Sequence, residues 1–182
     1  MASLLTIISA DPVGVLSKAS VFSFIAFAVF NGLNPGKRAM QTSILSDFIF
    51  GIKSSTLGFV ALYVLAVLFG APLTKKTERT FWTVLWIVSL SVFPISLRIH
   101  AAGQNWNHVF RIFHKSNSSV VVYQYQLLGT LIGAWVGCFC LPLDWNVQWK
   151  LYPIPVAIGA VFGTIGGILV GQGLSLVRKL SK

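Results

Sequence analysis

The sequence predicts an all-α membrane protein, a bundle of about five transmembrane helices with short interfacial helices between them. Hydrophobic residues make up 55% of the 182 residues and charged residues only 10%, which is typical of membrane proteins. Apolar stretches of about 19 to 24 residues recur along the chain, and each is long enough to cross a hydrocarbon core of ~30 Å. Sixteen glycines suit a helical membrane bundle better than a soluble core.

These stretches are expected to form one integral membrane domain over residues 1–182. The predicted spans are 13–33, 48–69, 81–99, 120–141 and 154–177. The first twelve residues are apolar but lack the basic region of a signal peptide, so no cleavage is expected. Asn34-Pro35-Gly36 ends the first span and Gly70-Ala71-Pro72-Leu73 ends the second, because glycine and proline do not continue a helix.

The third span is expected to begin with interfacial aromatic residues and to be kinked. Phe81, Trp82 and Trp86 suit the aromatic belt of a membrane surface, and Pro94 removes a backbone donor inside the helix. Residues 100–119 are too polar to span a membrane. Their apolar residues recur at helical spacing, which predicts a short helix lying on the membrane surface, with Trp106, Val109, Phe110 and Phe113 on its apolar face.

Glycine recurs at every fourth residue in the last two spans. These glycines are Gly129, Gly133 and Gly137 in the fourth span and Gly159, Gly163, Gly167 and Gly171 in the fifth. Residues at i and i+4 lie on one side of a helix, and small residues let two backbones approach closely in lipid. The glycines therefore predict packing between these two helices, contact with a partner's helix, or both. Gly166 and Gly173 lie off this stripe and leave room for a further helix.

Short motifs around these glycines resemble those of the PIG-F family. They are Gly133-Ala134-Trp135 with Gly137, Pro142-Leu143-Asp144-Trp145, Trp149 and Pro153, Gly159-Ala160 with Phe162-Gly163, and the earlier Gly70-Ala71-Pro72-Leu73. The resemblance is dense over residues 128–173, thinner over 60–100, and not visible before residue 50.

The resemblance implies a multi-pass protein of the endoplasmic reticulum membrane that acts in glycosylphosphatidylinositol (GPI) anchor biosynthesis. It implies a non-catalytic accessory subunit that binds and stabilises a membrane-anchored GPI ethanolamine phosphate transferase. Relatives in this family usually carry an additional span at the front, so this chain departs from the family pattern there; loss of one leading span would agree with a luminal N-terminus.

Basic residues are distributed unequally between the two sides of the predicted bundle. Five of the fourteen lie on the N-terminal side and nine on the other side. Because cytoplasmic segments carry the excess of lysine and arginine, the C-terminus is expected in the cytoplasm and the N-terminus in the lumen. The net charge of +10 then reflects topology, since no basic stripe or nucleic-acid-binding fold accompanies it.

No catalytic site, metal site or cofactor is expected in the chain. The histidines at positions 100, 108 and 114 share one connection and are expected to be polar-face residues of the surface helix. The predicted topology separates them by the bilayer from Asp11, Glu78 and Asp144. Such a separation excludes a mixed carboxylate–histidine centre built from these groups.

Asp144 is the acidic residue with the most specific surroundings. Trp145, Trp149 and Tyr152 follow it at helical spacing, so it is expected to cap a short interfacial helix, and contact with a partner or an ethanolamine ammonium is compatible with that role. Trp135, Asp144, Trp145 and Trp149 join the seven stripe glycines as predicted partner-binding or helix-packing residues. Gln124 and Gln126 are expected to make interhelical hydrogen bonds of roughly 0.6 kcal/mol each.

Two other functions are compatible with the composition. One is a small integral membrane lipid-handling protein or an enzyme acting on phospholipid headgroups, with membrane lipid as its partner; the other is a plain assembly chaperone. An enzyme would need carboxylates and basic residues on one face, and four scattered acidic residues supply little.

Overall fold

The computed structural model describes residues 11–33, 43–71, 77–104, 106–110, 118–139, 141 and 152–180. In these ranges the chain is helical throughout, with short turns. The helices are α2 (Pro12–Leu33), α3 (Ile44–Leu68), α4 (Thr77–Leu90), α5 (Val92–Ala101), α6 (Trp106–Phe110), α7 (Ser118–Phe139) and α8 (Ile154–Leu180). Five stretches are long and apolar enough to cross a membrane: Pro12–Phe30, Ile44–Leu68, Thr77–Ala101, Val120–Phe139 and Ile154–Val177. The predicted all-α fold with five candidate spans is confirmed.

Capping residues explain where the first two helices begin. The Gly14 amide donates to Oδ1 of Asp11 at 2.9 Å, and Pro12 occupies the first helical position, where its missing N–H costs nothing. Ser43 and Ser46 exchange side-chain and backbone hydrogen bonds in a capping box, which starts α3 four residues before the predicted bound of 48.

Glycine ends α3 as predicted. The helix stops at Leu68, and Gly70 takes a φ of +92°, in the left-handed region that residues with a β-carbon avoid. The Gly70 and Ala71 amides donate to the carbonyls of Val67 and Ala66, which satisfies acceptors of the last turn.

The third span is broken at Ser91, between α4 and α5, three residues before Pro94. Pro94 has no N–H to donate to the carbonyl of Leu90, one turn earlier. The side-chain amide of Gln126 on α7 donates to that carbonyl instead, at 2.8 Å, and is buried. The predicted kink is confirmed. The interhelical hydrogen bonds of Gln126 and of Gln124, which donates to the Val109 carbonyl at 3.2 Å, are confirmed too.

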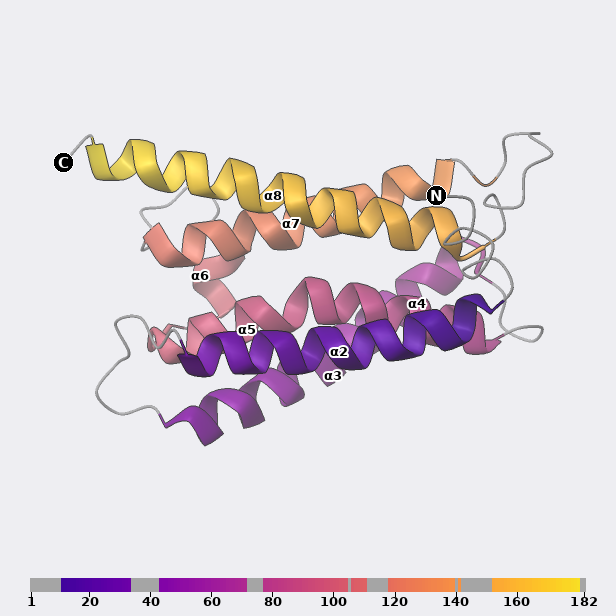
Figure 1. The fold of residues 1–182 in the computed structure, drawn as a ribbon, viewed down its shortest axis with the longest axis horizontal. Coiled ribbons are helices and arrows are strands. Elements are labelled where there is room, and N and C mark those ends of the chain that lie inside the picture. The colour runs from indigo at the N-terminus through magenta and orange to yellow at the C-terminus, as the bar shows by residue number, and fades with distance from the viewer. Residues whose placement is uncertain are drawn as a thin grey trace.

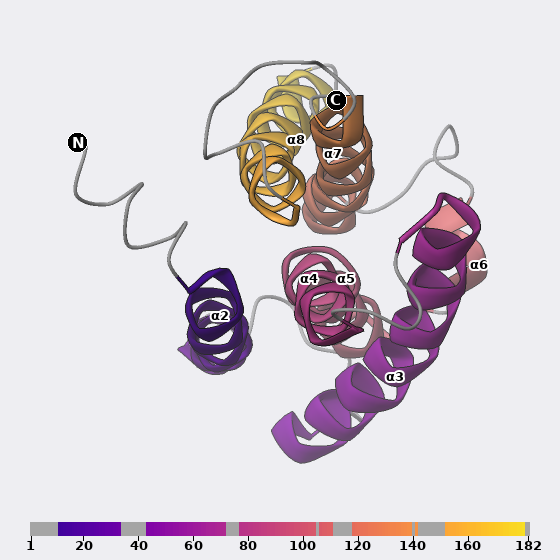
Figure 2. The ribbon, with the colours of Figure 1, turned by 90° about the vertical axis from the view of Figure 1, so that its right-hand side faces the viewer.

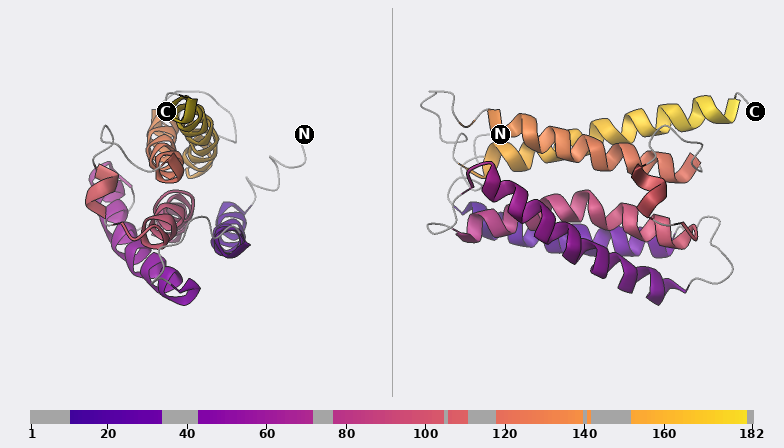
Figure 3. Two further views of the ribbon diagram at one scale, coloured as in Figure 1. Left: turned by 90° about the vertical axis from the view of Figure 1, so that its left-hand side faces the viewer. Right: turned by 180° about the vertical axis from the view of Figure 1, so that it is seen from behind.

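The α4–α5 span forms the centre of the molecule. Figure 2 shows it surrounded by α2, by α3 and by the α7–α8 pair. The two helices of the pair lie side by side, with the C-terminal end of α8 extending beyond α7 (Figure 1), and α3 crosses the bundle obliquely when seen from behind (Figure 3). At Gly51 and Gly58, α3 approaches α5 so closely that an added β-carbon would meet Leu97 at 2.9 Å and Val92 at 3.0 Å.

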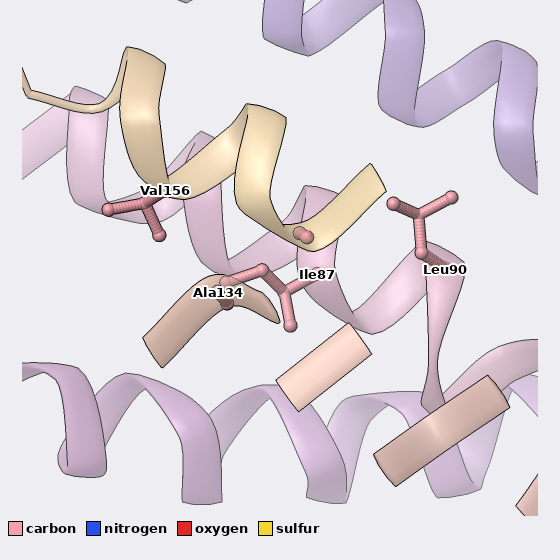
Figure 4. Packing of buried hydrophobic residues seen from close by; sticks show 5 residues of the cluster. Ile87, Leu90, Ala134 and Val156 are labelled. Atoms are coloured by element: carbon pink, nitrogen blue, oxygen red, sulfur yellow. The ribbon is translucent and has the colours of Figure 1, made fainter. Parts of the chain in front are cut away.

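The burial of side chains reflects the central position of α4 and α5. Most residues of α4 and α5 are buried, whereas the outer helices expose large apolar side chains such as Phe22, Leu57 and Phe162. Such exposure is expected of a surface that faces lipid. Figure 4 shows where the pair joins the centre: Ile87 and Leu90 of α4 pack with Ala134 of α7 and Val156 of α8.

The structure differs from the prediction at α6. Trp106 and Val109 turn into the bundle rather than onto the membrane surface: the Trp106 ring nitrogen donates to Ser54 Oγ at 3.2 Å, and Val109 packs buried against Ile95 and Ile99. The surface-helix prediction is therefore wrong for these two residues. Polar partners inside the bundle let the segment enter it, which the apolar spacing alone did not indicate. The predicted residue Phe113 lies outside the described residues.

Candidate functional site

The two glycine stripes face each other across the α7–α8 contact. Gly129 lies against Gly163 and Gly167, and Gly133 lies against Gly159 and Gly163. A β-carbon on Gly163 would overlap the Gly129 carbonyl oxygen and lie 2.9 Å from Cα of Gly133. The two backbones thus touch directly, which only glycine permits at these positions.

The remaining stripe glycines extend this contact at both ends of the helix pair. Gly137 lies against the backbone of Pro155 and Val156, and Gly171 lies against Val122. Gly166 and Gly173 differ, because a β-carbon on either would meet nothing within 4 Å. The structure therefore brings all seven stripe glycines into one interface and leaves the two off-stripe glycines open.

One polar contact joins the pair beside the glycines. Thr130 of α7 and Thr164 of α8 are both buried, and their hydroxyls are 2.8 Å apart. Each hydroxyl also lies within 2.7 Å of a carbonyl one turn back in its own helix. A hydroxyl has one hydrogen, so one threonine donates to its own helix and the other donates across. The sequence signal was that each threonine directly follows a stripe glycine.

An apolar groove of about 670 Å³ runs along this helix pair. Glycines form part of its lining, including Gly129, Gly133, Gly163 and the open Gly166. Larger apolar side chains complete it: Leu128, Ile132 and Val136 from α7, and Ile158, Phe162 and Val170 from α8. Trp135, another predicted contact residue, is half exposed on α7 and lies edge-on to Phe139, with the ring centroids 4.7 Å apart. A surface of this kind suits a helix or an acyl chain, and Tyr125 is the one lining residue with an ionisable side chain.

A polar cluster lies at the end of the bundle where α3 begins and α5 ends. Nδ1 of His100 is 2.7 Å from Oδ1 of Asp47, whose side chain is fully buried, and Phe50 stacks on the imidazole at 4.7 Å. Arg98 donates from Nε to the Tyr123 hydroxyl at 3.1 Å. An acidic residue inside a span is costly unless it is paired, so this cluster fixes α3 to the central span.

Sequence reasoning missed the Asp47–His100 pair. It treated the histidines together as residues of a surface helix and compared them only with the acidic residues on the other side of the membrane. Asp47 precedes the second span and His100 follows the third, so the predicted topology already put both on the same side. That shared side was the available signal.

The other candidate residues are placed only in part. Asp144, Trp145 and Trp149 lie outside the described residues. Tyr152, just before α8, accepts a hydrogen bond on its carbonyl from Nη1 of Arg79 at 3.2 Å, and burial raises the pKa of its phenol. Within the part of the chain that the structure describes, no three histidine, cysteine, aspartate or glutamate side chains gather as a metal site would require.

Comparison with known proteins points to one family, the one whose motifs the sequence resembles. The model of the GPI biosynthesis protein family Pig-F matches residues 1–172. The chain is 31% identical over 137 residues to the human protein named GPI ethanolamine phosphate transferase, stabilizing subunit, covering 71% of this chain and 61% of that one. It is 30% identical over 149 residues to glycosylphosphatidylinositol anchor biosynthesis protein 11 of Yarrowia lipolytica, covering 82% and 64%.

A fusion protein of Schizosaccharomyces pombe, named PIGF/3-ketodihydrosphingosine reductase, is 30% identical over 122 residues, covering 67% of this chain and 24% of that one. The matches thus span between a quarter and just under two thirds of these relatives' own lengths. No solved structure matches the chain.

Proposed function

Because this chain belongs to the GPI biosynthesis protein family Pig-F, we propose that it is a non-catalytic membrane subunit. It binds and stabilises a membrane-anchored GPI ethanolamine phosphate transferase, and so supports the addition of ethanolamine phosphate to a mannose of the GPI precursor. The observation that carries the proposal is the family match over residues 1–172. The metals, the nucleophile and the phosphoethanolamine donor belong to the partner.

The α7–α8 pair supports a binding role. Its backbones are in contact, so the pair is a rigid unit whose shape does not depend on flexible side chains. Its groove is apolar and partly lined by glycine, which lets a transmembrane helix of the partner approach closely. We assign this groove as a contact with the transferase, and Trp135, half exposed on α7, as a further contact residue.

The proposed location is the endoplasmic reticulum membrane, with the C-terminus in the cytoplasm. Arg98 and the Asp47–His100 pair lie at the end of the bundle that the charge distribution assigns to the cytoplasm, and Arg79 lies at the other end. In this orientation Asp144, Trp145 and Trp149 belong to a luminal connection. There they would brace the partner's luminal catalytic domain.

The groove also favours a second candidate function. An apolar groove of about 670 Å³ suits a lipid acyl chain as well as a helix, so a lipid-handling protein or a headgroup-modifying enzyme is the alternative. The two functions differ in what the chain does alone: an accessory subunit transfers nothing, whereas an enzyme transfers ethanolamine phosphate without a partner.

Affinity purification from mild detergent tests the proposal. A tagged chain should retain a GPI ethanolamine phosphate transferase, and the complex should transfer ethanolamine phosphate from phosphatidylethanolamine to a GPI precursor. The chain purified alone should show no transfer. Retention of no transferase, or transfer by the chain alone, would overturn the proposal and favour the alternative.

A further inference from the structure

A crevice separates α2 from α8 on one side of the central span. In the described residues, α2 packs mainly against α4 and α5, and α8 packs mainly against α7 and α4. Figure 2 shows α2 and α8 on neighbouring sides of α4. The crevice between them has a volume of about 220 Å³, and its lining comes from residues 12–19 of α2, residues 153–162 at the start of α8, and Trp86 of α4.

The crevice extends through about one leaflet of a membrane. At ~1.5 Å per residue, its lining covers about 10 Å along α2 and about 14 Å along α8. Both stretches lie at the start of their helices, and these two helices start at the same end of the bundle (Figure 1). Half of a ~30 Å hydrocarbon core is ~15 Å. The crevice therefore matches the reach of an acyl chain whose headgroup lies at that end.

The volume of the crevice favours an acyl chain over a helix. A helix with its side chains is about 10 Å across, so two turns of it occupy roughly 850 Å³, about four times the 220 Å³ of the crevice. A neighbouring helix could place single side chains in this space but not its backbone. An acyl chain is only one methylene wide and can lie along the full length of the crevice.

A basic side chain lies at the surface end of the crevice. Arg79 precedes Trp86 by seven residues on α4, which is about two turns, so the two side chains leave the same face of the helix. Nη1 of Arg79 donates to the Tyr152 carbonyl at 3.2 Å. The next residue, Pro153, lines the crevice. The guanidinium is therefore beside the point where the crevice begins on α8.

The Arg79 guanidinium has donors left for an anion. It carries five N–H donors, and the hydrogen bond to Tyr152 uses one of them. The side chain is partly exposed and, within the part of the chain that the structure describes, is not paired with a carboxylate. Of the acidic residues at this end, Asp11 caps α2 and Glu78 is exposed. A guanidinium beside an apolar crevice suits a phosphate that is attached to an acyl chain.

We propose that this crevice binds one phospholipid of the leaflet at the end where α2 and α8 begin. Its phosphate accepts hydrogen bonds from Arg79, and one of its acyl chains lies along the crevice. The lipid thus links α2 to α8, which few side chains of the described residues connect directly. It is a retained part of the bundle and is not modified, so this inference goes beyond the proposed function and does not depend on it.

Thermal unfolding of the full-length chain in lipid-free detergent tests the site with three added probes. Dioleoylphosphatidylcholine should raise the melting temperature by several degrees, because a ligand that binds only the folded state stabilises it. Dioleoylglycerol, which has the chains without the phosphate, and glycerophosphocholine, which has the phosphate without the chains, should raise it several-fold less. An equal rise with either of these two probes, or no rise with the phospholipid, would overturn the proposal.

Substitution of Arg79 tests the phosphate contact. Arg79→Gln should reduce the phospholipid-induced rise several-fold, and Arg79→Lys, which keeps the charge, should keep most of it. The readout is the rise relative to the same variant without lipid, so the lost hydrogen bond to Tyr152 does not affect it. The matched control is Lys18→Gln, an exposed cation on α2 that does not line the crevice. A full rise in Arg79→Gln, or an equal reduction in Lys18→Gln, would contradict the contact.

Filling the crevice tests the acyl-chain contact. Ala19 lines the crevice from α2, so Ala19→Leu should retain several-fold less phospholipid, measured by native mass spectrometry of the purified chain. The matched control is Ala26→Leu, at an exposed position of the same helix outside the lining, and it should retain as much as the wild type. Equal retention by the two variants, or no phospholipid on the wild-type chain, would contradict the proposal.

Photo-crosslinking in the intact complex distinguishes a lipid from a protein occupant. A benzoylphenylalanine at Val15, a partly exposed residue of the crevice lining, should form adducts with phospholipid. Adducts with the transferase instead would show that a partner's helix covers the crevice and would overturn the proposal. Failure of the proposed function looks different, because the wild-type chain would then bind the phospholipid but retain no transferase.

Discussion

At the scale of single residues, the interior is held by side chains that satisfy particular backbone groups. The clearest case is Gln126, whose amide donates to the Leu90 carbonyl that Pro94 leaves without a donor. In an apolar interior, an unsatisfied carbonyl costs roughly 1–3 kcal/mol. Pro94 and Gln126 therefore act together: the proline breaks the third span, and the glutamine from α7 makes the break tolerable.

A double-mutant cycle tests this coupling. Gln126→Leu should destabilise the chain by about 1–3 kcal/mol, because the Leu90 carbonyl then has neither partner. In a Pro94→Ala background the same change should cost less, since the introduced alanine would supply a backbone N–H to the Leu90 carbonyl. The measurement is the unfolding free energy, or the melting temperature, in detergent. Equal costs of Gln126→Leu in both backgrounds would contradict the coupling.

At the scale of the elements, α7 and α8 form a unit whose two kinds of glycine have different surroundings. Gly163 is in backbone contact with Gly129, whereas Gly166 on the same helix opens into the groove. One class of glycine is needed to form the helix pair. The other class leaves room in the groove for a partner's helix or a lipid chain.

Leucine substitutions at these two glycines distinguish the classes. Gly163→Leu should force the helices apart, at a cost on the order of 1–3 kcal/mol from overpacking, and lower the steady-state amount of the protein. Gly166→Leu should leave the amount unchanged but reduce transferase retention by filling the groove. Immunoblots of membranes and of purified complexes measure both. Wild-type amounts and retention for Gly163→Leu would show that the stripe is not needed for packing.

At the scale of the whole molecule, the charge distribution predicts an orientation in the membrane. The five-to-nine asymmetry of basic residues predicts a cytoplasmic C-terminus and a luminal N-terminus. A C-terminal tag should be reached by antibody after selective permeabilisation of the plasma membrane, and a tag next to Ala2 should not. Glycosylation of Asn117, whose sequon lies on the predicted cytoplasmic side, would show that the map is inverted or that a span is miscounted.

Much of the fold could be predicted from the sequence because a membrane restricts the choice of structures. Apolar length gives the five spans, Gly70 gives the end of α3, and Pro94 gives the broken third span. The glycine spacing predicted a close helix contact at α7 and α8 for the same reason, because repeated glycine in a membrane helix indicates that another helix approaches it closely.

Tertiary pairing explains what the sequence did not predict. The inward turn of α6 depends on Ser54 and on Gln124, which are distant in sequence, and helical spacing alone cannot identify such partners. To predict the Asp47–His100 pair from the sequence, one has to relate two residues that are 53 positions apart.

The most direct test of a stabilising role is the lifetime of the transferase's catalytic subunit after protein synthesis is blocked. In cells lacking this chain, its half-life should fall several-fold, and the wild-type chain should restore it whereas Gly163→Leu should not. GPI precursors lacking the ethanolamine phosphate should accumulate in parallel. An unchanged half-life of the transferase in the absence of this chain would contradict the account, whatever happens to the precursors.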